Sequence, residues 1–106
     1  MSSWVFAMED DLEEEKIKLV KVAGKQILFI RKEGKVYAIG NSCPHMGCPL
    51  KSGILNGYVL KCGCHNWGFD IRTGENVDTG EYIDILDPKV DIYDIELAEG
   101  KISVLL

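Results

Sequence analysis

The chain has 106 residues, of which 46% are hydrophobic and 27% are charged. This length suits one domain with one core, and the composition excludes an intrinsically disordered chain. The net charge of −5 argues against nucleic acid as a partner, because proteins that bind nucleic acids present basic surfaces. We therefore expect a single domain that spans residues 1–106.

The chain lacks the pattern of a membrane protein. No apolar run approaches the roughly 18 to 20 residues that a membrane helix needs. The longest run, Ile27 to Ile30, has the length of a strand. The opening residues have neither the basic start nor the apolar centre of a signal peptide. These features predict a soluble, cytoplasmic protein that does not insert into a membrane.

The first forty residues carry β signals and no helical periodicity. Trp4–Met8 is predicted to be a short strand, and the acidic run at residues 9–15 to be a solvated loop with Leu12 turned inward. Residues 17–22 alternate between apolar and charged side chains, and the phase slips at Val20 as it would at a β-bulge.

The remaining elements also predict strands and tight turns. Residues 26–31 are mostly apolar, so we expect a strand that is covered on both faces. Glu33-Gly34 and Asn56-Gly57 are typical of hairpin turns. A last hairpin is expected between Val90–Leu97 and Ile102–Leu105. No helix, repeat or linker is predicted.

All four cysteines and both histidines lie in two short segments, Cys43–Leu50 and Cys62–Asp70. Each segment offers one thiolate and one imidazole, in the patterns Cys43-x-His45 and Cys62-x-x-His65. Such a donor set can hold a tetrahedral zinc ion or a two-iron, two-sulfide cluster. The hairpin at Asn56-Gly57 lies between the segments and is predicted to return the second beside the first.

The two segments together resemble the Rieske iron–sulfur family. Cys-Pro-His-x-Gly-x-Pro-Leu begins at Cys43, Cys-x-x-His begins at Cys62, and Phe-Asp-x-x-Thr-Gly begins at Phe69. The resemblance implies an all-β fold of stacked antiparallel sheets, with a small cluster-binding subdomain at about residues 41–74. It also implies one 2Fe–2S cluster per chain, with Cys43 and Cys62 on one iron and His45 and His65 on the other.

The second cysteine pair, Cys48 and Cys64, resembles that of the high-potential Rieske proteins, in which the two residues form a disulfide. The alternative is a pair of reduced, buried cysteines. High-potential members also carry a Ser and a Tyr where this chain has Trp67 and Phe69. Without those hydroxyl donors, we expect a reduction potential below that of the quinol-oxidising proteins.

Other residues of the two loops are expected to surround the cluster. Some would exclude water from it, and the glycines would let backbone amides approach its sulfides. The set is Pro44, Met46, Gly47, Leu50, Gly63, Asn66, Trp67 and Phe69.

The function predicted from these residues is one-electron transfer between a reductase and a terminal oxidoreductase, through His45 and His65. Imidazole ligands raise the potential of such a cluster from around −400 mV to roughly −150 to +300 mV. Both histidines are then used by the cluster, so we expect redox-protein partners and no catalytic apparatus. Three alternatives remain: a small Rieske subunit of a nitrite reductase or ring-hydroxylating oxygenase system, the head of a quinol-oxidising complex, and a structural zinc module.

Overall fold

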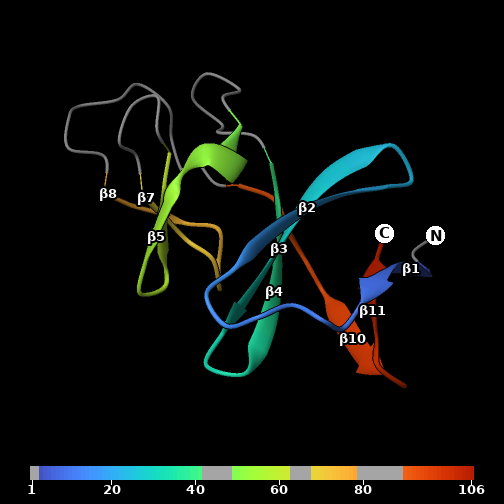
Figure 1. Ribbon diagram of the computed structural model, residues 1–106. Helices are drawn as coiled ribbons and strands as arrows, with labels where there is room; N and C mark the ends of the chain where they lie inside the picture. The colour runs from blue at the N-terminus through green and yellow to red at the C-terminus, as the bar shows by residue number, and fades with distance from the viewer. Residues whose placement is uncertain (1–2, 42–48, 63–67, 79–89) are drawn as a thin grey trace.

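The computed structural model describes residues 3–41, 49–62, 68–78 and 90–106, which form three antiparallel sheets (Figure 1). The middle sheet has the order β2-β3-β4-β9, with β2 at Ile17–Val22, β3 at Lys25–Lys32, β4 at Lys35–Gly40 and β9 at Ile92–Tyr93. The second has the order β1-β11-β10, with β1 at Trp4–Glu9, β11 at Lys101–Leu105 and β10 at Ile95–Ala98. The third has the order β5-β6-β7-β8, with β5 at Ile54–Asn56, β6 at Val59–Lys61, β7 at Gly68–Asp70 and β8 at Asn76–Asp78.

Strand β3 connects the two cores of the molecule. Successive side chains of a strand point to opposite faces. Accordingly, Leu28 and Ile30 pack with residues of the third sheet, and Ile27 and Phe29 pack with residues of the second. All four side chains are fully buried, which confirms the prediction of a strand covered on both faces. The stacked antiparallel sheets are those expected from the sequence.

The hairpin turns follow from their residue types. Glu33 and Gly34 have φ of 52° and 80° between β3 and β4, as a two-residue turn with both central residues at positive φ requires. Strand residues Asn56 and Val59 pair with each other, so the turn between β5 and β6 consists of Gly57 and Tyr58. This turn is one residue later than predicted.

The predicted β-bulge at Val20 is not present in β2. β2 and β3 pair from Ile17↔Ile30 to Val22↔Lys25 without a register shift, so β2 has no bulge at Val20. The phase of β2 slips because its first half packs on one core through Ile17 and its second half packs on the other through Val20 and Val22. A register shift occurs instead between β1 and β11.

The predicted strand Val90–Leu97 is divided between two sheets. β9 pairs with β4 in the middle sheet, and β10 pairs with β11 in the second. The only helical element among the described residues is the 3-10 helix η1 at Leu50–Ser52. No helix in the described ranges has the length and apolar character that crossing a membrane requires.

The acidic run is more ordered than a solvated loop. Leu12 is buried, as predicted. However, Arg31 donates a hydrogen bond of 2.7 Å to the Leu12 carbonyl and forms an ion pair with Asp10. The Glu14 carboxylate accepts N–H donors of the β3–β4 turn, at 2.5 Å from Glu33 and 3.2 Å from Gly34. These bonds, that from Glu33 above all, lower the pKa of Glu14.

Candidate metal centre

Most of the predicted ligand set lies outside the described residues. This applies to Cys43, His45 and His65 among the four ligands, and to both members of the Cys48–Cys64 pair. It also applies to Pro44, Met46, Gly47, Gly63, Asn66 and Trp67. The structure does describe the fourth ligand, Cys62, and its predicted neighbours Leu50 and Phe69, together with the ends of both loops.

Asn41 joins the two ends of the first loop. It follows β4 directly, and it is buried with 8% of its surface exposed. Its Oδ1 accepts a hydrogen bond of 2.8 Å from the Lys51 backbone N–H, on the far side of residues 42–48. Its Nδ2 donates to Gln26 Oε1 at 3.1 Å. Asn41 was not among the predicted site residues, although it is a polar side chain between an apolar strand and the first cysteine.

The β5–β6 hairpin returns the chain to the segment that follows the first loop, as predicted. Ile54 pairs with Lys61 across the two strands. A Cβ on Gly53 would lie 2.2 Å from the Lys61 carbonyl oxygen, so only glycine permits this close approach. Lys61 in turn pairs with Gly68 of β7, which closes the second loop. The segment that follows the first loop is therefore in contact with Lys61, which precedes the second loop by one residue.

Cys62 lies at this junction. It follows β6, it is fully buried, and it forms no disulfide. Its core neighbours include Leu50, Leu60 and Phe69, all fully buried. Cysteine binds metals as the thiolate, and a bound metal supplies the positive charge that compensates it. A buried thiol at the entrance to a loop rich in Cys and His fits a cluster ligand.

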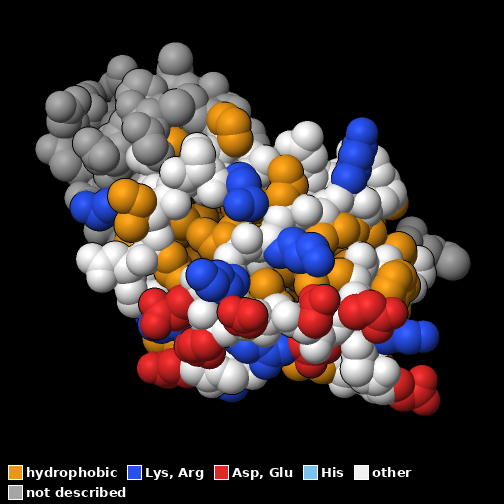
Figure 2. All heavy atoms as spheres, in the orientation of Figure 1, with side chains coloured by type: hydrophobic (Ala, Val, Ile, Leu, Met, Phe, Trp, Pro, Cys, Tyr) orange, Lys and Arg blue, Asp and Glu red, His pale blue; other side chains and the backbone are white. Residues whose placement is uncertain are grey.

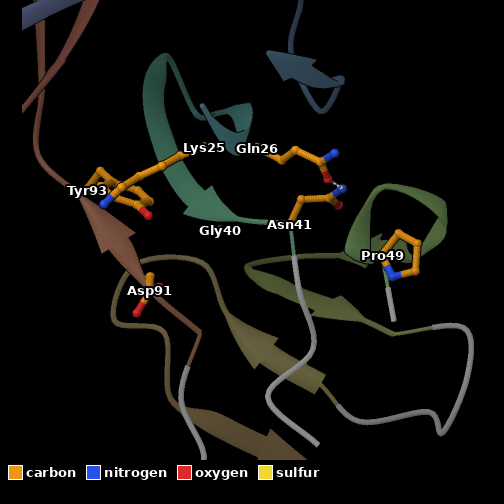
Figure 3. Close-up of a pocket in the computed structure, with 7 residues that line it drawn as sticks. All are labelled: Lys25, Gln26, Gly40, Asn41, Pro49, Asp91 and Tyr93. Carbon is orange, nitrogen blue, oxygen red and sulfur yellow. Dashed lines mark hydrogen bonds between the residues drawn. The ribbon is translucent and has the colours of Figure 1, made fainter. Parts of the chain in front are cut away.

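A groove of about 410 Å³ runs beside the ends of the first loop (Figure 3). Its walls include Gly40 and Asn41 before the loop and Pro49 after it. On the other side, the Lys25 chain reaches over the Tyr93 ring, with Nζ 5.9 Å from the ring centroid. Burial raises the pKa of Tyr93, and the neighbouring Asp91 adds to this effect.

A polar contact holds the other end of the β5–β6 hairpin. Tyr58 Oη donates a hydrogen bond of 2.6 Å to Glu33 Oε2 at the β3–β4 turn. The Tyr58 ring packs edge-on against Tyr37, with 6.0 Å between centroids, and Arg72 lies over it at 4.2 Å. The bond to Glu33 is the main reason that the pKa of Tyr58 rises to about 12. Arg72 also donates to Asp70, and these bonds lower the pKa of Asp70.

Comparison with known families identifies this arrangement. Residues 3–84 match the family described as Rieske [2Fe-2S] domain. The chain belongs to the Rieske family. Membership implies a 2Fe–2S cluster, and the buried Cys62 with its apolar neighbours at the end of β6 is consistent with such a group. The family also accounts for the all-β architecture of stacked sheets.

Relatives within the Rieske family indicate the role. The chain is 36% identical over 78 residues to the ferredoxin component of the naphthalene 1,2-dioxygenase/salicylate 5-hydroxylase systems of Ralstonia sp, covering 73% of this chain and 75% of that protein. It is also similar to the ferredoxin of carbazole 1,9a-dioxygenase from Nocardioides aromaticivorans IC177, with 27% identity, a TM-score of 0.81 and coverage of 96% of each chain.

The terminal oxygenase of the same carbazole system contains a similar domain. That match has 30% identity and a TM-score of 0.82, and it covers 95% of this chain but 29% of the oxygenase. The present Rieske chain thus matches ferredoxins along their length and the oxygenase in one part. This confirms the prediction of an electron carrier that is not itself the catalytic component.

Proposed function

We propose that this chain is a single-domain Rieske ferredoxin, residues 1–106, that works in the cytoplasm and holds one 2Fe–2S cluster. Cys43 and Cys62 bind one iron, and His45 and His65 bind the other. The observation that supports this assignment is the fully buried Cys62 thiol at the junction of the two loop ends. When bound, the cluster supplies a site that accepts and releases one electron.

The residues of the chain have distinct tasks in this function. Cys62 provides a ligand that the core holds in place, since Leu50, Leu60 and Phe69 pack with it. The same side chains exclude water from that side of the site. Asn41 fixes the distance between the two ends of the first loop through its bonds to Gln26 and Lys51. We expect these bonds of Asn41 to limit the reorganisation that accompanies a change of charge at the site.

The electron partners that we propose are a reductase and the terminal component of an oxygenase system. The similarity to the ferredoxin component of the Ralstonia systems supports this choice. A second candidate is a Rieske subunit held permanently within a larger enzyme, which the similar domain inside the carbazole oxygenase favours. Size-exclusion chromatography of the native protein separates the two: a free carrier elutes alone, and a subunit elutes with its enzyme.

Optical and EPR spectra of the purified protein test the proposal. We expect a red-brown protein that bleaches with dithionite and then gives a Rieske-type EPR signal. Substitution His65→Ala should abolish that signal, because it removes one of the two nitrogen ligands. A colourless protein that contains zinc would contradict the proposal and support a structural zinc module.

We also propose that Cys48 and Cys64 form a disulfide that joins the two loops. A disulfide would limit the freedom of the loops when the cluster is absent. Alkylation of the unfolded, metal-free and unreduced protein, followed by mass spectrometry, tests for this disulfide. Two labelled cysteines per chain indicate the disulfide, and four indicate that the pair is reduced.

A further inference from the structure

Three exposed residues lie in the chain between the first loop and the second. They are Pro49, Lys51 and Ile54, which we call the loop-side patch. Pro49 is the first described residue after the first loop. Ile54 pairs with Lys61, which directly precedes Cys62. The patch is therefore next to the site in which the cluster is proposed to bind.

Ile54 is exposed to an unusual degree for an apolar side chain. Its relative exposure is 73%, the highest among the large hydrophobic residues that the structure describes. Its neighbour Leu55 packs on the core, so alternation along β5 directs Ile54 to the outer face. Strand formation does not explain an isoleucine here, because threonine is also β-branched and would leave no apolar surface in water.

Lys51, the charged member of the loop-side patch, has the opposite sign to the net charge of the chain. The net charge is −5, yet Lys51 is the one charged residue between Pro49 and Ile54. On the face in Figure 2, the surface next to the residues of uncertain placement carries basic and hydrophobic side chains, and the acidic side chains gather along the other side. Glu33, for example, lies in the β3–β4 turn, whereas the first loop follows the other end of β4.

We propose that the loop-side patch is the docking surface for a redox partner that presents carboxylates around an apolar contact. This inference rests on the proposed electron-carrier function. Ile54 supplies an apolar contact that becomes buried on docking, and Lys51 orients an acidic partner surface. Exposed apolar patches with a polar rim commonly mark protein interfaces. Complementary charge raises the rate of encounter and fixes orientation more than it adds affinity.

An electrode surface of known chemistry can replace the partner in the test. The full chain with its cluster is adsorbed on gold that carries a mixed carboxylate- and methyl-terminated monolayer, or on gold that carries an ammonium-terminated one. Voltammetry then measures the interfacial electron-transfer rate. We expect the faster rate on the carboxylate and methyl surface, although the net charge of the protein favours the ammonium surface. A faster rate on the ammonium surface would overturn the proposal.

Matched variants locate the effect. Lys51→Glu should slow electron transfer on the mixed surface by about tenfold, because it replaces an attraction to the carboxylates that orients the protein with a repulsion. Lys35→Glu makes the same charge change at the start of β4, at the opposite end of that strand from the first loop, and should have little effect.

The apolar contact has its own pair of variants. Ile54→Thr keeps the β-branched shape and should slow electron transfer more than Leu97→Thr, which alters an exposed apolar residue of β10. Equal losses within either pair would overturn the docking role of that residue.

Dithionite bleaching of the same samples separates two kinds of failure. If the wild-type protein does not bleach, the proposed electron-carrier function itself is wrong. If all variants bleach alike and their electrode rates are also alike, the carrier function holds and the docking surface is refuted.

Discussion

The two ends of this Rieske protein are stabilised in different ways. The middle and second sheets contain strands of up to eight residues, and they enclose a core whose largest members are fully buried. In the third sheet every strand has three residues. That sheet is held by its core contacts and by a few side-chain hydrogen bonds, from Asn41 at one end and Tyr58 at the other. From this comparison we expect the middle and second sheets, which we call the body, to determine global stability, and these polar contacts to affect mainly the proposed cluster site.

Phe29→Ala should have the largest effect on stability. Phe29 is fully buried between the middle and second sheets. Truncation of such a residue removes apolar contacts and leaves a cavity, at a cost of about 3–5 kcal/mol in the free energy of unfolding. Chemical denaturation of the metal-free and cluster-loaded proteins measures this loss of unfolding free energy. We expect similar losses in both, and a loss confined to the loaded form would contradict the division between body and site.

Asn41→Ala should weaken the site more than the body. It removes the part-buried hydrogen bond that Asn41 accepts from the Lys51 N–H, which costs about 0.5–1.5 kcal/mol. The rate at which the cluster is lost to a chelator should rise, and the far-UV circular dichroism should stay the same. Gln26→Ala is the control, because it leaves the bond between Asn41 and Lys51 in place. Equal rates for the two variants would show that Asn41 does not position the loop.

Tyr58→Phe tests the opposite end of the third sheet. This change removes the hydroxyl that donates to Glu33 and keeps the ring that packs against Tyr37 and Arg72. Because the pKa of Tyr58 is raised to about 12, ultraviolet titration should show one tyrosine that ionises well after the ordinary value of 10. That late step should be missing from Tyr58→Phe. If the late step persists, it belongs to another tyrosine.

Glu14→Gln should have the smallest effect on the stability of the fold, and this effect should depend on pH in the acid range. The folded pKa of Glu14 is below its ordinary value of 4.5, so its contribution to stability is present above that value and is lost as the pH falls through the folded pKa. Unfolding midpoints measured across this window should fall more for the wild type than for Glu14→Gln. Parallel curves would show that the bonds to the β3–β4 turn do not stabilise the fold.

Much of this fold could be predicted because its signals are local. The Glu33-Gly34 turn and the apolar run of β3 each depend on a few adjacent residues, and both have the expected structure. The Cys62 segment was recognisable for the same reason, since a ligand motif is a short pattern of residue types. The position of the β5–β6 turn was wrong by one residue, because Asn56 joins the strand ladder instead of the turn.

The missed features depend on contacts between distant parts of the chain. Asn41 is important because the fold brings Gln26 and Lys51 to its two polar atoms. Glu14 looked like one of several solvated acids, yet it binds the turn after β3. The apparent bulge at Val20 reflects two separate cores, which no pattern within β2 could reveal. Tertiary packing decides each of these cases.

EPR quantitation of the reduced protein, with Cys62→Ala as the control, tests the central claim most directly. Uptake of one electron per chain should produce one unpaired spin per chain in the wild-type protein, with a Rieske-type spectrum. Cys62→Ala should lose that signal and keep the circular dichroism of the β-sheet body. An unchanged signal in Cys62→Ala, or no paramagnetic reduced state in the wild-type protein, would contradict the account.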